Sequence, residues 1–173
     1  MKTREIDTVT LFQSLDKATD EFYRLVSIVD EKKFNKVPFE DGWSVAQVAT
    51  HVKKSNKAIA QGLQMDGTPS NRNSEERIDE LKKIFLDFSA KYQSPEFIIP
   101  EKKIYQKDIV LGQLQHSIVE LKRLRNHTNL DEIISLPVFG EITKLEILHF
   151  VLYHTQRHIH QLKNINSIIN SKK

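Results

Sequence analysis

The chain has 173 residues and no cysteine, which excludes disulfides and thiolate metal ligands. Its formal charge is only +3, with 26 Lys and Arg against 23 Asp and Glu. Acidic and basic residues alternate, which argues against a basic stripe for nucleic acid. Hydrophobic residues make up 39% of the chain, enough for the core of one domain over residues 1–173. The five glycines disfavour phosphate loops and turn-dense β folds, so we expect a mostly helical protein.

The location expected from the sequence is cytoplasmic. No stretch approaches the roughly 20 apolar residues of a membrane span. The N-terminus begins with charged residues instead of the apolar core of a signal peptide. We therefore expect a protein that binds neither a membrane nor nucleic acid.

Apolar residues at intervals of three and four predict five helices. The expected helices cover about residues 7–29, 44–63, 78–88, 108–126 and 143–168. Two capping boxes support the second and the last of them, Ser44 with Gln47 and Thr143 with Glu146. Residues 129–141 are expected to form an irregular crossover. Four long helices and one short helix predict an all-α fold, an antiparallel four-helix bundle.

Four of the seven histidines lie on the last predicted helix. At about 100° per residue, His154 and His158 lie about 40° apart, at one edge of the apolar arc. His149 and His160 fall on the opposite side, so we expect both to be solvated surface residues. The same geometry places His51 on the inward face of the second helix.

Three inward histidines on two helices suggest a metal site. A single inward histidine is usually a hydrogen-bonded core residue, because a buried imidazole needs polar partners. One metal ion would satisfy His51, His154 and His158 together. Neutral imidazole suits zinc, nickel, copper or iron, and three protein ligands leave a position open, as in catalytic sites. The segment 154–158 lacks the glutamate of the H-E-x-x-H motif, so a protease mechanism is not expected.

Other residues invite weaker predictions. Glu146 and His149 have the Glu-x-x-His spacing of a di-iron site, but a single copy does not make one. Trp43 is expected to pack as a hydrophobic staple beside the Ser44 cap. Tyr153 and Phe150 fall outside the apolar arc, so Tyr153 is expected at the surface or at an interface. Phe150 is the basis for expecting a homodimer.

Two short segments resemble the DinB/YfiT-like family. The first is Trp43-Ser44-Val45-Ala46-Gln47 with His51-Val52, and the second is Tyr153-His154, Arg157-His158 and Gln161 on the last helix. The resemblance implies a bundle of up-down-down-up topology, with His51, His154 and His158 as metal ligands. Many members follow the last histidine with Arg-Gly-Gln, where this chain has Ile159-His160-Gln161. Gln161 keeps the register and is expected either to orient a ligand or to form an interhelical hydrogen bond.

The resemblance also implies a function. Characterised relatives include metal-dependent transferases that use a thiol such as bacillithiol or mycothiol, and a thiol-dependent isomerase. The expected cofactor is a divalent transition metal, zinc or nickel first and iron or manganese next. The expected partners are a small-molecule thiol and an electrophilic substrate, with water as the other candidate nucleophile. A non-catalytic stress-response or binding module, with a structural or absent metal, is the alternative.

Overall fold

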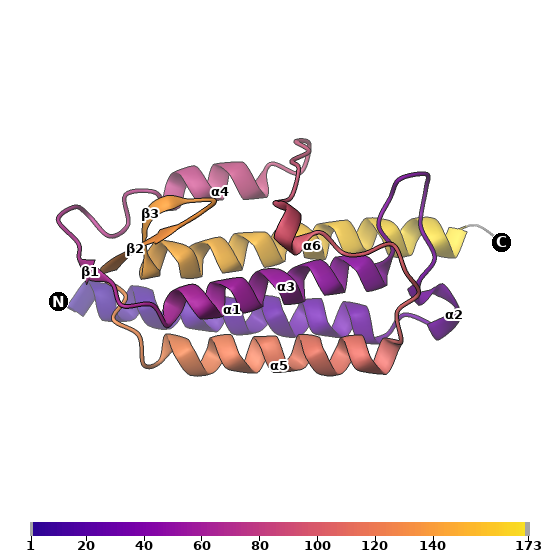
Figure 1. Ribbon diagram of the computed structural model, residues 1–173, viewed down its shortest axis with the longest axis horizontal. Coiled ribbons are helices and arrows are strands. Elements are labelled where there is room, and N and C mark those ends of the chain that lie inside the picture. The colour runs from indigo at the N-terminus through magenta and orange to yellow at the C-terminus, as the bar shows by residue number, and fades with distance from the viewer. Residues whose placement is uncertain (1, 172–173) are drawn as a thin grey trace.

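The computed structural model describes the backbone of residues 2–171 and the side chains of residues 7–171. Four long helices form the bundle: α1 (Lys2–Ser27), α3 (Val45–Leu63), α5 (Lys107–Arg125) and α6 (Lys144–Ser171). In Figure 1, α1 and α6 run in one direction along the long axis, and α3 and α5 run in the other. The up-down-down-up four-helix bundle is therefore confirmed.

Short elements fill the connections. They are α2 (Glu31–Phe34), α4 (Ile78–Leu86), the 3-10 helix η1 (Glu96–Ile98) and the strands β1 (Thr68–Pro69), β2 (Glu132–Leu136) and β3 (Gly140–Thr143). Figure 1 shows α4 outside the bundle, beside α6, and the segment from α4 to α5 running across the middle of α3. Among residues 2–171, no helix has both the length and the hydropathy needed to cross a bilayer.

Both predicted capping boxes are present. The Ser44 hydroxyl accepts a hydrogen bond from the Gln47 amide, and the Gln47 side chain accepts one from the Ser44 amide. In the same way, the Thr143 hydroxyl accepts from the Glu146 amide, and the Glu146 carboxylate accepts from the Thr143 amide. These bonds satisfy backbone donors that a helix leaves free at its start. They fix the first turns of α3 and α6, the two helices that carry the inward histidines.

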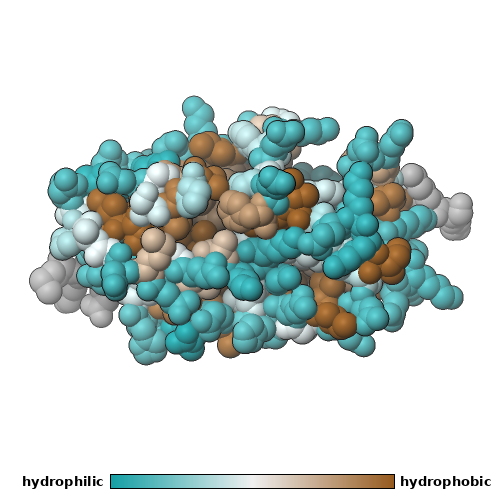
Figure 2. Space-filling model, viewed as in Figure 1, coloured by the Kyte–Doolittle hydropathy of each residue, from teal (hydrophilic) through white to brown (hydrophobic). Residues whose placement is uncertain are grey.

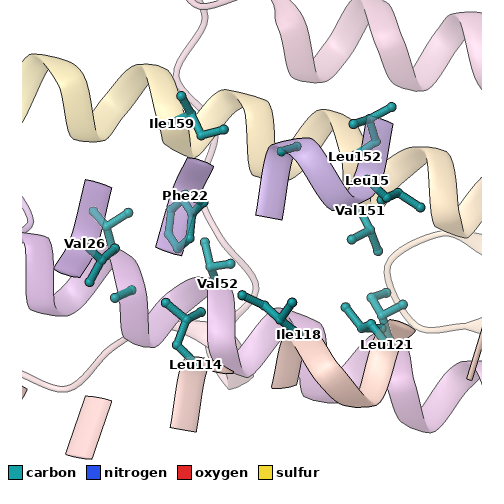
Figure 3. Close-up of a cluster of buried hydrophobic side chains, with 14 of the residues drawn as sticks. Leu15, Phe22, Val26, Val52, Leu114, Ile118, Leu121, Val151, Leu152 and Ile159 are labelled. Atoms are coloured by element: carbon teal, nitrogen blue, oxygen red, sulfur yellow. The ribbon is translucent and has the colours of Figure 1, made fainter. Parts of the chain in front are cut away.

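The bundle core is built from all four long helices. Figure 3 shows apolar side chains from each of them converging on one interior. The labelled residues are Leu15, Phe22 and Val26 of α1, Val52 of α3, Leu114, Ile118 and Leu121 of α5, and Val151, Leu152 and Ile159 of α6. This burial orients α3 and α6, because the apolar stripe of each helix has to face the same interior.

The irregular crossover expected at 129–141 is wrong, because most of this segment is a hairpin. β2 and β3 pair antiparallel, with Leu136 opposite Gly140, and β1 adds to the other edge of β2. Gly140 has φ of +63°, a backbone conformation that glycine adopts without the steric cost of a Cβ. The sheet lies beside the start of α6 (Figure 1).

Two expectations about α6 are also wrong. Phe150 is buried, with its ring centroid 5.0 Å from Phe85 and 4.8 Å from Phe139. Tyr153 is buried as well, and its hydroxyl lies 3.3 Å from Nδ1 of the half-buried His149. Both errors have one cause: α4 and the β2–β3 segment cover sides of α6 that a plain four-helix bundle leaves open. The homodimer stays a prediction, but it can no longer rest on Phe150.

Glu146 links the start of α6 to the loop before α4. Its side chain is fully buried and accepts hydrogen bonds from Arg72 at 2.7 and 2.8 Å. The amides of Arg77 and Thr143 donate to the same carboxylate at 2.9 Å. Burial alone would raise the pKa of Glu146, but the hydrogen bonds from Arg72 and these amides lower it overall. Glu146 is therefore ionised in the folded protein at neutral pH.

We expect Arg72→Met to lower the free energy of unfolding by about 2–3 kcal/mol at pH 7, because it leaves a buried carboxylate without its cation. The pKa of Glu146 is lowered on folding, so the pair stabilises the protein above the usual value of 4.5 and loses this contribution as the pH falls below it. Urea unfolding at pH 7 and pH 3 measures both effects. The control is Arg24→Met, at an exposed position of α1; equal stability of the two variants at pH 7 would contradict the prediction.

Candidate metal centre

Three imidazoles meet between α3 and α6. His51 comes from the middle of α3, and His154 and His158 lie one turn apart on α6. Their exposed fractions are 1%, 6% and 7%. Nε2 of His154 lies 3.1 Å from Nε2 of His51 and 3.0 Å from Nε2 of His158. The inward positions expected for these three histidines are therefore the ones they occupy, and one ring nitrogen of each faces a common point.

The other ring nitrogen of two of these histidines is held by an oxygen acceptor. Nδ1 of His51 lies 3.1 Å from the carbonyl oxygen of Ile98, and Nδ1 of His158 lies 2.7 Å from Oε1 of Gln161. A carbonyl oxygen can only accept, so each Nδ1 carries the proton. In a neutral imidazole this leaves Nε2 with a free lone pair. The two contacts therefore set the tautomer that a metal ligand requires.

Hydrogen bonds within the cluster cannot satisfy all three Nε2 atoms. Those of His51 and His158 are both acceptors, and His154 can donate a single proton from Nε2. At least one buried lone pair is therefore left without a donor, which is unfavourable in an apolar interior. A metal ion at the common point would accept all three lone pairs. Tetrahedral zinc, with Zn–N bonds of about 2.0–2.1 Å, would separate its ligand nitrogens by about 3.3 Å, close to the distances present.

Burial also keeps the cluster neutral. Desolvation lowers the pKa of His51 to about 4 and that of His158 to about 3. It lowers the pKa of His154 well below the usual 6.5, and the neighbouring histidines lower it further. At neutral pH the three lone pairs are therefore available to a cation without competition from protons.

Aromatic rings surround the cluster. The ring centroid of Trp43 lies 5.1 Å from that of His51, and those of Phe150 and Phe85 lie 5.0 and 6.1 Å from that of His154. Trp43 is half-buried against the core beside the Ser44 cap, as expected, and it also forms a wall of the site. Within the described residues, no carboxylate joins the three histidines in a potential metal-binding group.

Two hollows in the described surface lie away from the cluster. One, of about 700 Å³, is lined by the 69–75 loop with Asn129 and Asp131. The other, of about 310 Å³, lies between α1 and the start of α6, beside His149. Neither is lined by a member of the cluster. The metal centre is enclosed in this conformation because all three histidines are buried.

The structure also bears on the predictions for the other polar residues of α6. Gln161 contacts His158 on its own helix, so the hydrogen bond found is not an interhelical one, and the orienting role stays a prediction. His160 is exposed as predicted and stacks on Phe88, whereas His149 is half-buried and not fully solvated. The Ile98 carbonyl was not predicted. Any residue supplies a carbonyl, so its role depends on where the chain runs between α4 and α5.

We expect Gln161→Leu to weaken zinc binding by about 10- to 100-fold, the usual effect of losing the partner of a ligating histidine. Nδ1 of His158 would lose its acceptor, so the competing tautomer would become accessible. Gln161→Glu is the matched control, because it keeps an oxygen acceptor at the same position. Competition with a chromogenic chelator measures the affinity. Equal affinities of the leucine variant and the unaltered protein would show that Gln161 does not orient His158.

The chain is therefore a helical protein with an up-down-down-up bundle and a candidate metal site of three imidazoles. A family model for the DinB superfamily matches residues 14–162. The chain therefore belongs to the DinB superfamily.

The known relatives agree with this assignment. The uncharacterized protein YuaE of Bacillus subtilis (strain 168) is 25% identical over 150 residues, covering 82% of this chain and 88% of YuaE. Among solved structures, YfiT from Bacillus subtilis is described as a probable metal-dependent hydrolase with an unusual four-helix bundle topology. The match to YfiT has a TM-score of 0.61 at 16% identity, and it covers 94% of this chain and 87% of the YfiT chain.

A second solved structure is similar over most of this chain. It is the mycothiol-dependent maleylpyruvate isomerase, with a TM-score of 0.59 at 16% identity. The match covers 94% of this chain but only 65% of the isomerase. At this identity both solved structures support the fold alone.

Proposed function

We propose that this protein is a divalent-metal-dependent enzyme whose ion is held by His51, His154 and His158. The observation that carries the proposal is the convergence of three Nε2 atoms, two of them fixed as acceptors by the Ile98 carbonyl and Gln161. All-imidazole ligation favours zinc or nickel over calcium or magnesium. Three protein ligands leave a position for a reacting molecule, as catalytic sites do and closed structural zinc sites do not.

The nucleophile in this proposal is a low-molecular-weight thiol or water. When bound, the ion would lower the pKa of either molecule at the open position. The chain has no cysteine, so a thiol has to come from a cosubstrate. Glu146 is the fully buried carboxylate of α6, but Arg72 and two backbone amides already engage it. The proton of the nucleophile would therefore leave with the substrate or to solvent, without a carboxylate base from this helix.

The likeness to YfiT and to the isomerase supports both versions of the proposal. One is described as a probable metal-dependent hydrolase and the other as thiol-dependent. We propose the same two chemistries here, transfer to or from a thiol such as bacillithiol and attack by water. An activity screen would therefore combine a panel of such thiols with electrophilic substrates. It would also include reactions without a thiol, to test attack by water.

Metal content tests the proposal directly. Mass spectrometry of untagged protein should find about one transition-metal ion per chain, lost in the His154→Ala, His158→Ala double variant. The matched control is His160→Ala, which removes an exposed histidine of the same helix and should keep the ion. Absence of metal after incubation with zinc or nickel would reject the enzyme proposal.

A non-catalytic binding or stress-response module is the second candidate. The enclosure of the three histidines favours it, because each is at most 7% exposed. X-ray absorption on the zinc-loaded protein distinguishes the two. Because the chain has no cysteine, a zinc–sulfur distance that appears when a small thiol is added would support the enzyme, and an unchanged ligand shell would support the module.

A further inference from the structure

A short strap closes the metal centre on its outer side. This strap is residues 95–101, which include η1 and cross α3 between α4 and α5 (Figure 1). Ile98 and Pro100 of the strap are buried and the Ile98 carbonyl contacts His51, whereas Phe97 and Ile99 are 57% and 43% exposed. The strap therefore has few apolar anchors, which is typical of segments that open at low free-energy cost. Because Ile98 of the strap contacts His51, lifting the strap would uncover this side of the cluster.

Lys54 fastens this strap from the turn after His51. Its ammonium donates to the Ile99 carbonyl at 2.9 Å and to Glu101 at 2.7 Å. The Glu101 side chain is 54% exposed, and the Lys54 hydrogen bond is the main reason why its pKa is about 2. The Tyr105 hydroxyl donates to the Glu101 carbonyl at 2.9 Å and anchors the end of the strap next to α5. The clasp on Lys54 is therefore polar and exposed to competing ions.

Positive charge dominates the surface around this clasp. Lys53 interacts electrostatically with Lys54, Lys57 and Lys103, and with Glu101 as the acidic member of the group. Figure 2 shows hydrophilic side chains along α3 on this face, next to hydrophobic ones where the segment from α4 crosses it. A group of four lysines with one carboxylate attracts anions and disfavours cationic ligands.

We infer that Lys54 binds a carboxylate of the incoming ligand. As the strap lifts, the ammonium releases the Ile99 carbonyl and the Glu101 carboxylate and binds that ligand carboxylate instead. This inference rests on the proposed function and assigns its substrate to the class of small carboxylates. The exchange conserves charge, because one carboxylate replaces another on Lys54. It also couples recognition to access, because the bond that the ligand replaces is one that keeps the centre closed.

Zinc removal from the loaded protein by two chelators tests the inference. Dipicolinate is a dianion and 1,10-phenanthroline is neutral, so the ratio of their rates reports attraction of the anion. We expect Lys54→Met to lower this ratio about fivefold, the size of an exposed ion pair. Glu101→Gln, which frees Lys54, should raise it. Lys57→Met removes an exposed lysine one turn further along α3 and should leave the ratio within about a factor of two.

The outcomes separate this inference from the proposed function. Equal changes in both rates in Lys54→Met would show that Lys54 is a clasp and not an anion receptor, and no change would overturn both roles. If the protein takes up no zinc, the proposed function fails, and hydrogen exchange of the metal-free protein then tests the role of Lys54. Succinate at constant ionic strength should speed exchange of the strap amides in the unaltered protein but not in Lys54→Met. Equal exchange in the two proteins would overturn the inference.

Discussion

Zinc is expected to raise the thermal unfolding midpoint by about 10 °C when free zinc is a thousandfold above its dissociation constant. Binding to the folded state alone then adds about 4 kcal/mol of stability. A chain of this size gains about 2–4 °C per kcal/mol. The ion also accepts the lone pairs of His51 and His158, which otherwise compete for a single Nε2 proton of His154 at 3.1 and 3.0 Å. Differential scanning calorimetry with and without zinc measures the rise.

His154→Ala should abolish this rise, because it removes the nitrogen that contacts both other ligands. The variant also leaves a cavity, which lowers stability with or without metal. The informative quantity is therefore the difference between zinc-loaded and metal-free samples of the same variant. His160→Ala should keep the full difference. A zinc-induced rise that survived in His154→Ala would place the ion elsewhere.

Part of this site could be predicted from the sequence. Helical periodicity places His51, His154 and His158 on inward faces, because α3 and α6 have regular apolar stripes and capped starts. The contact of Gln161 with His158 follows from the i, i+3 spacing on one helix. The Ile98 carbonyl could not be predicted in this way. It reaches Nδ1 of His51 from 47 positions away along the chain, through a segment whose path depends on tertiary packing.

Periodicity failed where a helix has neighbours on several sides. Phe150 and Tyr153 were placed outside the apolar arc, an interpretation that assumes a single buried face. In the structure α6 packs against α1, α3 and α4, and also contacts β2 and β3, so its buried arc extends around most of the helix. Phe85 and Phe139, which cover Phe150, come from elements outside the four-helix core.

The β2–β3 hairpin left a signal that was available in the sequence. Residues 132–136 contain consecutive β-branched residues, Ile133 and Ile134, and residues 140–143 follow Pro137 and begin with Gly140. Two short runs of this kind separated by turn residues are typical of a hairpin. The expected helical context led to their interpretation as a crossover. The error matters for the site, because the sheet supports the start of α6 through Thr143.

The metal-free protein is expected to lose stability between pH 6.5 and pH 4. Burial lowers the pKa of His51 to about 4 and that of His158 to about 3 in the folded state, whereas the unfolded chain binds protons near the usual 6.5. Below pH 6.5 the unfolded state therefore binds more protons, and stability falls until the folded state is also protonated. His51 alone should remove about 2 kcal/mol by pH 5.

Urea unfolding of metal-free protein at pH 7 and pH 5 checks this loss. His51→Leu should lose about 2 kcal/mol less between the two pH values than the unaltered protein, because leucine takes up no proton. The control is His116→Leu, at an exposed position of α5, which should keep the full loss. If His51→Leu and the unaltered protein lost the same amount, His51 would not be a buried neutral imidazole. If the expected difference appears, the same burial that weakens the metal-free protein in acid keeps the His51 lone pair available to a cation at neutral pH.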